Sequence, residues 1–316
     1  MSELVLRVLK PGLLSTLQDL GRTGYQHLGV SPCGAMDALA LRLANRLVGN
    51  PDNSVSLELT LAGTALEVLR DCEVAMAGAD LTAHLDSKPL ACWENCTART
   101  GQRLVFSQRK RGARAYLSIA GGFAAENVLG SRSTDLRNGW GGLQGRRLQR
   151  GDELCAHQPG GRESRLLWAV RPEVLVEYQN PFLLRVLKCQ QSELFGNETR
   201  RRFLAAEFTI SADSNRMGYR LEGPRLRAPE QELISEATPI GAIQILPNGE
   251  ALLLMADRQT VGGYPKIAVL ISADLPKAAQ LCPGHRVRFQ SVSLEEAHQA
   301  LAKQEERLEL DLLWRS

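Results

Sequence analysis

The chain has 316 residues, which is enough for two domains of ordinary size or one large one. Hydrophobic residues make up 44% of it, a share typical of soluble globular proteins, and no window approaches the roughly 18 consecutive apolar residues of a membrane span. The formal charge of +3 is small for this length and favours neither nucleic acid nor a membrane surface as a partner.

The N-terminus and the cysteines both favour a cytoplasmic protein. The opening residues, Met1 to Leu4, lack a basic start followed by an apolar core, so we expect no signal peptide. The seven cysteines are an odd number and are scattered, which does not fit a secreted disulfide framework. Cys92 and Cys96 form a close pair, but no second pair follows at zinc-ligand spacing. We therefore expect reduced thiols and no bound metal.

The first clear elements lie in the N-terminal half. Apolar residues recur at helical spacing across 36–47, and Gly49 and Pro51 follow as a stop signal, which predicts a helix. Residues 55–61 alternate between apolar and polar, which predicts a strand with one buried face. Glu58 falls on the polar face of that strand. Facing water is the simpler interpretation of Glu58, and facing a pocket is the alternative.

Two further strand-like segments, 103–107 and 115–119, flank the basic run 108–112. Their proximity predicts a β-hairpin whose basic tip is solvated. In the C-terminal half a weak helix is expected over 198–206. Ser293 and Glu296 have the spacing of a capping box and lead into a charged helix that ends near residue 307.

The remaining chain reads mostly as short strands in two halves. The start of each half carries a similar strand, and a Pro-Gly-Gly segment near 159–164 predicts the boundary between them. We expect domains at 1–162 and 163–316. Many short strands with few helices predict a mainly β fold, of the α+β class, with two β-barrel-like domains.

Several familiar cofactor and catalytic motifs are absent from the sequence. It contains no phosphate-binding loop and no Gly-x-Gly-x-x-Gly after a strand, and His-Glu-x-x-His and Gly-x-Ser-x-Gly are also missing. No Met-Lys-Met occurs that would accept biotin covalently. If ATP takes part in the function, a new kind of site or a partner must supply part of its binding.

Four segments combine glycine with Arg, Asn, Gln, Ser, Thr or Asp where packing alone would not require them. They are Thr16–Asp37, Ser118–Gly122 with Leu129–Thr134, Ser214–Leu221 and Met255–Ile271. Glycine lets a ligand approach the backbone closely, and arginine offers a planar fork that suits carboxylate or phosphate. Polar turns are the alternative for any one segment, but four together favour a binding site on loops.

Two single residues in the first segment are candidates for catalytic groups. Cys33 lies between Pro32 and Gly34, an exposed type of position for a nucleophile, but no base is evident nearby. His27 could exchange protons, although a lone histidine is more often structural. We therefore assign neither a catalytic role.

The motifs in these segments, in this order, resemble those of the biotin-dependent carboxyltransferase family. They are Ser15–Arg22, Ser31–Asp37, Ala120–Gly122, Gly130–Thr134, Ser214–Gly223 and Asp257–Lys266. The resemblance extends from about Leu4 to the final helix. This family includes the C subunit of bacterial 5-oxoprolinase, also called the KipA-like protein, and the carboxyltransferase domain of urea carboxylase.

The resemblance implies two cyclophilin-like β-barrel domains and a role within a complex. In 5-oxoprolinase, the KipA-like protein acts with two other subunits, a KipI-like one designated B and one designated A. Together they cleave 5-oxo-L-proline, a lactam, to L-glutamate with ATP as co-substrate. The chain has no biotin-carrier segment, which favours this function and implies no covalent biotin here. The alternatives are a carboxyltransferase that acts on urea or a related amide with a biotin carrier in trans, and a regulatory protein that binds a KipI-like kinase inhibitor.

The resemblance supplies positions for a site, and the chemistry of each side chain suggests its role. We expect Lys266 and Arg216 to hold anionic groups, and Asp257 and Glu58 to orient water or a proton. Other residues expected to contact substrate are Arg22, Ser131, Arg132, Asn215, Tyr219, Gln259, Thr260 and Tyr264. Among these, Asn215, Gln259 and Tyr264 are expected to bond the lactam amide.

Overall fold

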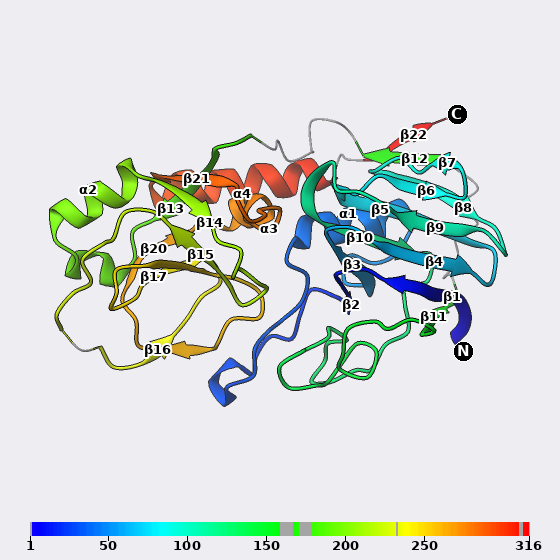
Figure 1. The fold of residues 1–316 in the computed structure, drawn as a ribbon, viewed down its shortest axis with the longest axis horizontal. Helices are drawn as coiled ribbons and strands as arrows, with labels where there is room; N and C mark the ends of the chain where they lie inside the picture. Colours follow the sequence, from blue (N-terminus) through cyan, green and yellow to red (C-terminus); the bar gives the residue numbers. More distant parts are fainter. Residues whose placement is uncertain (1, 159–166, 171–178, 232, 310–311, 316) are drawn as a thin grey trace. The chain divides into compact units, whose positions relative to one another are not determined.

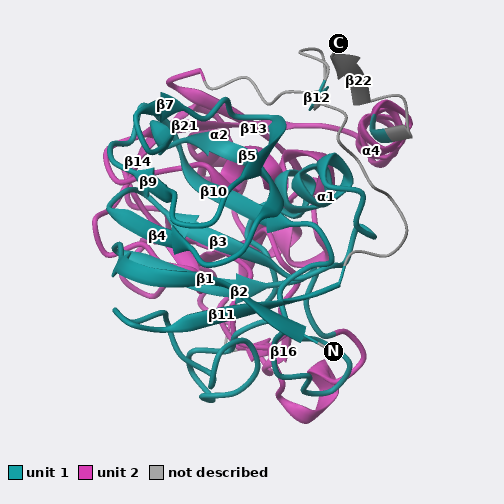
Figure 2. Ribbon diagram, turned by 90° about the vertical axis from the view of Figure 1, so that its right-hand side faces the viewer, with its two compact units in different colours: residues 1–22, 33–175, 308–316 teal, residues 23–32, 176–307 magenta. Residues whose placement is uncertain are grey.

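The fold was determined as a computed structural model. It describes residues 2–158, 167–170, 179–231, 233–309 and 312–315. The chain forms two compact units, which Figure 2 colours separately. Unit 1 comprises residues 1–22, 33–175 and 308–316, and unit 2 comprises residues 23–32 and 176–307. The domain boundary expected between residues 162 and 163 lies outside the described residues.

The described strands of unit 1 form two sheets (Figure 1). In spatial order the first sheet contains β11 (Glu153–His157), β1 (Ser2–Pro11), β4 (Thr64–Val68), β9 (Arg103–Phe106), β6 (Ala83–Leu85) and β7 (Lys88–Pro89). The second contains β2 (Leu14–Gln18), β3 (Ser56–Thr60), β10 (Arg111–Ile119), β5 (Cys72–Asp80), β8 (Glu94–Ala98), β12 (Leu167–Val170) and β22 (Leu312–Arg315). One buried cluster includes Leu66 and Phe106 from the first sheet and Leu57 and Leu117 from the second. The two sheets therefore share one hydrophobic core.

The hairpin expected from residues 103–107 and 115–119 does not form. Both segments lie in strands, and residues 108–111 of the basic run are exposed, but the strands belong to different sheets. β9 pairs with β4 and β6, whereas β10 pairs with β3 and β5. The prediction was wrong in the pairing because long-range packing, not nearness in sequence, selects the partners of a strand.

The helix expected over 36–47 is confirmed as α1 (Ala38–Leu47). Asp37 is its N-cap, and the Asp37 carboxylate accepts a hydrogen bond from the Ala40 N–H at 2.9 Å. Leu43 and Leu47 lie on its buried side, and the helix packs against β5 and β10. One face of the second sheet is therefore covered by α1.

The strands of unit 2 close into a barrel. In spatial order they are β13 (Phe182–Leu187), β20 (Lys266–Leu270), β17 (Ala242–Ile245), β18 (Ala251–Leu254), β15 (Gly218–Glu222), β14 (Glu207–Ile210) and β21 (Arg286–Ser291). A parallel pair, β13 with β21, completes the ring. β16 (Glu236–Ala237) and β19 (Val261–Gly262) form a separate two-stranded ribbon. The register between β17 and β20 shifts between Ile243 and Gln244, so that Gln244 lies opposite Lys266.

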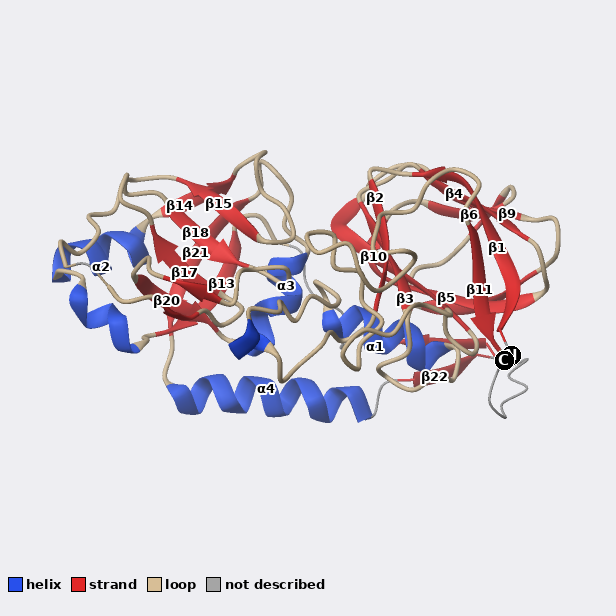
Figure 3. Ribbon diagram, turned by 90° about the horizontal axis from the view of Figure 1, so that it is seen from below, coloured by secondary structure: helices blue, strands red, loops and turns tan. Residues whose placement is uncertain are grey.

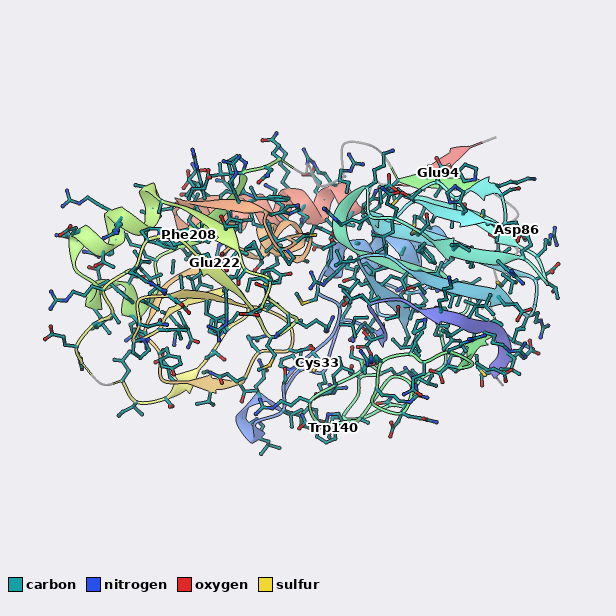
Figure 4. All side chains as sticks on the ribbon, viewed as in Figure 1. Cys33, Asp86, Glu94, Trp140, Phe208 and Glu222 are labelled. Carbon is teal, nitrogen blue, oxygen red and sulfur yellow. The ribbon has the colours of Figure 1, made fainter. Side chains whose placement is uncertain are left out.

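Unit 2 also contains helices and 3-10 turns. They are η1 (Gln26–Leu28), η3 (Gln190–Leu194), α2 (Asn197–Ala205), η4 (Ser272–Asp274), α3 (Leu275–Ala279) and α4 (Leu294–Glu309). α2 confirms the helix expected over 198–206. Its Phe203 stacks on Phe289 of β21 at 4.8 Å and contacts Phe208 of β14, which is labelled in Figure 4. This aromatic group fixes α2 on the barrel.

The capping box expected before α4 is confirmed by two reciprocal hydrogen bonds. The Ser293 N–H donates to the Glu296 carboxylate at 2.7 Å, and the Glu296 N–H donates to the Ser293 hydroxyl at 3.1 Å. The bond to the N–H of Ser293 helps to hold the pKa of Glu296 below its ordinary value.

Strands predominate over helices in both units (Figure 3). The expected mainly β fold with few helices is therefore confirmed, and unit 2 contains a closed barrel. Among the helices in the described part of the chain, none has the length and apolar character needed to cross a membrane.

Candidate functional site

The expected site residues fall into both units, and each unit is described by itself. Unit 1 holds Arg22, Glu58, Ser131 and Arg132. Unit 2 holds Asn215, Arg216, Tyr219, Asp257, Gln259, Thr260, Tyr264 and Lys266.

Glu58 of unit 1 is buried, with 1% of its surface exposed. Its carboxylate accepts a hydrogen bond from the Tyr116 hydroxyl at 2.6 Å and another from the Met36 N–H at 3.0 Å. The Tyr116 oxygen in turn accepts from the Asp37 N–H at 2.8 Å, at the start of α1. The simpler expectation, that Glu58 faces water, was wrong because the start of α1 covers that face of β3.

Tyr116 keeps its proton, so its hydroxyl continues to donate a hydrogen bond to the Glu58 carboxylate. Burial is the largest cause that raises the pKa of Tyr116 well above its ordinary value, and the carboxylates of Glu58 and Asp37 add to it. The chain Glu58–Tyr116–Asp37 therefore links a carboxylate in β3 to the N-terminus of α1. This arrangement holds Glu58 in one position.

Asp19, which follows β2, organises the loop after β10. Its carboxylate accepts hydrogen bonds from the hydroxyls of Ser131 and Ser133 at 2.6 and 2.5 Å. It also accepts from the N–H groups of Arg132 and Gly21 at 2.6 and 2.8 Å. Ser131 is buried by these contacts, whereas the side chain of Arg132 is exposed. Sequence reasoning noted the motif that contains Asp19 but did not select Asp19 itself.

Arg22 is among the largest fully buried side chains of the protein. Its Nη2 donates to the Ser133 carbonyl at 2.5 Å, and its Nε donates to the Val128 carbonyl at 3.4 Å. Its Nη1 lies 4.0 Å from the Asp135 carboxylate and has no hydrogen-bond partner among the described residues. Two of the donors of Arg22 therefore hold the backbone of the loop after β10.

Asp135 is a second carboxylate inside this loop. It accepts hydrogen bonds from the Trp140 indole at 2.9 Å and from the Asn138 amide at 2.7 Å; Figure 4 labels Trp140. Burial raises the pKa of Asp135, but these hydrogen bonds outweigh burial and hold the pKa below its ordinary value. The loop is thus built around two carboxylates that accept several hydrogen bonds each.

Arg216 and Asp257 of unit 2 form a buried ion pair. Arg216 Nε and Nη2 donate to the two Asp257 oxygens at 2.8 and 2.9 Å, and Arg216 is 4% exposed. The Asp257 N–H also donates to the Arg216 carbonyl at 3.0 Å. This bidentate pair joins the start of β15 to the end of β18. One edge of the Arg216 fork is therefore already engaged by Asp257.

Lys266 is the first residue of β20 and is 4% exposed. Its Nζ is ion-paired with the carboxylate of Glu236 at 2.6 Å and has no other partner among the described residues. Glu236 is about half exposed, so the counter-ion of this buried ammonium borders solvent. The backbone N–H of Lys266 donates to the side-chain oxygen of Gln191 at 2.8 Å. An ammonium in this setting is suited to bind an anionic or carbonyl oxygen.

Gln244 lies opposite Lys266 and was missed by sequence reasoning. It is fully buried; its Nε2 donates to the Tyr264 carbonyl at 3.2 Å, and its Oε1 has no partner among the described residues. The signal in the sequence was a lone amide inside the apolar run Ala242–Ile245, which is unusual in a buried strand.

Three polar or partly polar side chains surround Gly262. A Cβ at this position would lie 2.8 Å from Gln259 Nε2, 3.0 Å from Gln244 Nε2 and 3.2 Å from a methyl carbon of Thr238. Gly262 therefore leaves room for Gln244 and Gln259 to approach the same piece of backbone. The carbonyl of Thr238 accepts a hydrogen bond from the buried Arg258 at 2.8 Å, which fixes the adjoining segment.

The other expected residues of unit 2 differ in exposure. Asn215 is exposed, and its side-chain oxygen accepts from the Met217 N–H at 2.8 Å, which caps the turn before β15. Gln259 and Tyr264 are exposed, Thr260 is half-buried, and Tyr219 is buried in β15. In the residues that the structure describes, no group of three His, Cys, Asp or Glu could hold a metal ion.

Comparison with known proteins gives consistent results for sequence and structure. The model of the carboxyltransferase domain, subdomain A and B, matches residues 28–291. The chain is 38% identical to the C subunit of 5-oxoprolinase from Escherichia coli K12, over 98% of each chain. It is also 38% identical to the C subunit of 5-oxoprolinase from Haemophilus influenzae, over 92% of each chain.

A solved structure resembles the fold closely. The urea amidolyase of K. lactis superposes with a TM-score of 0.89 and 31% sequence identity over 96% of this chain. This chain spans 19% of that much longer protein. On the evidence of sequence and structure together, the chain is a member of the carboxyltransferase domain family that comprises subdomains A and B.

Proposed function

We propose that this chain is the C subunit of an ATP-dependent 5-oxoprolinase, a cytoplasmic complex that also contains the KipI-like B and the A subunits. The reaction would cleave 5-oxo-L-proline to L-glutamate. The observation that carries this proposal is the 38% identity, along 98% of both chains, with the C subunit from E. coli. A match of this extent leaves no large segment of the relative without a counterpart here.

The chemistry explains why the site would need a buried cation. Opening the lactam adds water to its carbonyl carbon and breaks the C–N bond, so that the ring nitrogen becomes an amine and the carbonyl a carboxylate. Hydrolysis of ATP to ADP and phosphate drives the reaction. Negative charge develops on the lactam oxygen or on a phosphate bound to it, and a preorganised cation stabilises that charge. Lys266 is suited to this role because it is buried beside a half-exposed counter-ion.

The other residues receive supporting roles in this proposal. Asp257 fixes the guanidinium of Arg216 through the bidentate pair, so that Arg216 contributes positive charge from one position. Glu58, Arg22 and Ser131 position loops of unit 1, because their described polar contacts are made to groups of the protein itself. The sequence contains no nucleotide-binding motif, so we assign ATP binding to the assembled complex.

A reconstitution tests the proposal. The purified chain is mixed with the A and B subunits, ATP and 5-oxo-L-proline, and the release of glutamate and phosphate is followed. Glutamate should appear in the full mixture and not when this chain is omitted. An assembled complex that releases no glutamate would refute the proposal.

A second candidate is carboxyl transfer to urea or a related amide, with a biotin carrier in trans. The superposition on urea amidolyase, with its TM-score of 0.89, favours this candidate. It predicts activity that depends on a biotinylated carrier and that avidin blocks. Because 5-oxoprolinase activity requires no biotin in the first proposal, avidin distinguishes the two.

A further inference from the structure

Two buried polar atoms of unit 2 lie on neighbouring strands and keep unused hydrogen-bonding capacity among the described residues, although one of them is ion-paired with Glu236 at 2.6 Å. They are Lys266 Nζ on β20 and Gln244 Oε1 on β17. The ladder places these two residues directly opposite each other, after the shift in register. Buried polar groups are nearly always hydrogen-bonded, so two such atoms at one point of a sheet indicate a place for a ligand.

We propose that Gln244 determines substrate specificity by accepting a hydrogen bond from the N–H of a cis amide whose oxygen binds Lys266. The inference rests on the proposed function and extends it, because it names the residue that would recognise the lactam nitrogen. Sequence motifs pointed instead to Asn215, Gln259 and Tyr264, none of which is buried.

The orientation of the Gln244 amide is set by the protein. Its Nε2 donates to the Tyr264 carbonyl at 3.2 Å, and a carbonyl can accept but not donate. The opposite orientation would place two oxygens against each other. Oε1 is therefore the atom that stays available, and it requires a donor.

The pair of groups selects the ligand by its pattern of donor and acceptor. Lys266 offers N–H donors, and Gln244 offers an acceptor, so a complementary ligand presents an acceptor and a donor on one edge. A five-membered lactam has this edge because its ring holds the amide cis, with the oxygen and the N–H side by side. An open-chain secondary amide is trans and places the two groups on opposite edges.

Charge supports the same assignment. The ammonium of Lys266 is ion-paired with the half-exposed Glu236 at 2.6 Å, and its remaining N–H donors are available for an electron-rich ligand oxygen. A lactam oxygen that gains negative charge during the reaction would be a stronger partner than the neutral ground-state oxygen. Gln244 is neutral and would therefore recognise the nitrogen without opposing that charge.

The test compares two ligands that differ at one atom. The assembled complex of all three subunits is titrated with 5-oxo-L-proline and with its lactone analogue, in which the ring N–H is replaced by oxygen. The wild-type complex should bind the lactam about tenfold or more tightly, because the lactone places an oxygen against Gln244 Oε1. Gln244→Met removes the acceptor at similar size and should reduce the ratio of the two affinities to near one.

Gln290→Met is the matched control, since it makes the same change at an exposed position of the same barrel. It should keep the wild-type ratio. The ratio is measured within each variant, so partial loss of folded protein cancels. If Gln244→Met does not fold, the wild-type comparison still decides: equal affinities for lactam and lactone would overturn the inference.

The result is separable from the fate of the proposed function. Turnover of 5-oxo-L-proline without discrimination between lactam and lactone would overturn the role of Gln244 alone. If no turnover occurs, binding of 2-pyrrolidone and of its lactone counterpart, γ-butyrolactone, is compared on the same complex. A preference for 2-pyrrolidone that Gln244→Met removes would support the inference while the proposed function fails.

Discussion

Gly262→Ala should weaken substrate binding, and the structure gives the size of the effect. The added methyl carbon would lie 2.8 Å from Gln259 Nε2 and 3.0 Å from Gln244 Nε2. Ordinary contacts begin at about 3.5 Å, so both amides must move. Gln259 is exposed and can turn away, but Gln244 is buried and bonded to the Tyr264 carbonyl.

The cost follows from what Gln244 loses. Moving it by a few tenths of an ångström carries Oε1 away from the lactam N–H and weakens that neutral hydrogen bond, worth about 1 kcal/mol, and the strain of restoring it in the complex adds a cost of similar size. A loss of about 1–2 kcal/mol in the bound state corresponds to an affinity roughly 5–30 times weaker. We expect this change in the Kd of the reconstituted complex for 5-oxo-L-proline, measured by calorimetry.

The neighbouring glycine provides the control. Among the described residues, a Cβ at Gly263 would meet only the Ser235 hydroxyl oxygen at 3.3 Å and the Leu233 carbonyl oxygen at 3.5 Å. Gly263→Ala should therefore leave affinity within about twofold of the wild type. Unchanged affinity in Gly262→Ala, or an equal loss in Gly263→Ala, would refute the reasoning.

Three further predictions follow from other contacts. Lys266→Ala should abolish glutamate release while the circular dichroism spectrum stays unchanged. The control Lys303→Ala, at an exposed position of α4, should retain activity. Near-normal turnover by Lys266→Ala would contradict the role proposed for Lys266. Tyr116→Phe removes two buried hydrogen bonds and should lower the free energy of unfolding of unit 1 by about 2–4 kcal/mol, measured by urea titration. A loss below about 0.5 kcal/mol would contradict the link from Glu58 through Tyr116 to α1. Hydrogen bonds that outweigh burial lower the pKa of Asp135 in the folded protein. Its carboxylate therefore contributes stability that is fully present above the ordinary pKa of about 4. This stability is lost as the pH falls through the pKa of the folded state. The stability difference between wild type and Asp135→Asn should therefore be larger at pH 6 than at pH 3, and an unchanged difference would exclude this linkage.

Local elements were predictable from sequence because their determinants are local. The helical spacing over 36–47 and the capping pair Ser293 and Glu296 each act within a few residues, and both appear as expected. The mainly β class followed from many short alternating segments. The partners of β9 and β10 were not predictable in this way, because the two strands lie in different sheets and each pairs with strands that are distant in sequence.

The candidate residues came from sequence motifs, whereas their surroundings could not be read from the sequence. Motifs led to Lys266, Arg216 and Asp257, which the structure shows to be charged groups engaged at the barrel. The burial of Glu58 depends on Tyr116 and on the start of α1, which periodicity within one strand does not report. Gln244 was missed because its importance comes from its register opposite Lys266.

The composition of unit 1 has a consequence for how the protein is made. The outer strand β22 (Leu312–Arg315) pairs with β12 of the second sheet, although residues 176–307, the larger part of unit 2, lie between these strands in sequence. Ribosomes synthesise a chain from its N-terminus, so β12 is made well before its partner. The second sheet therefore gains its outer strand only after all of unit 2 has been synthesised.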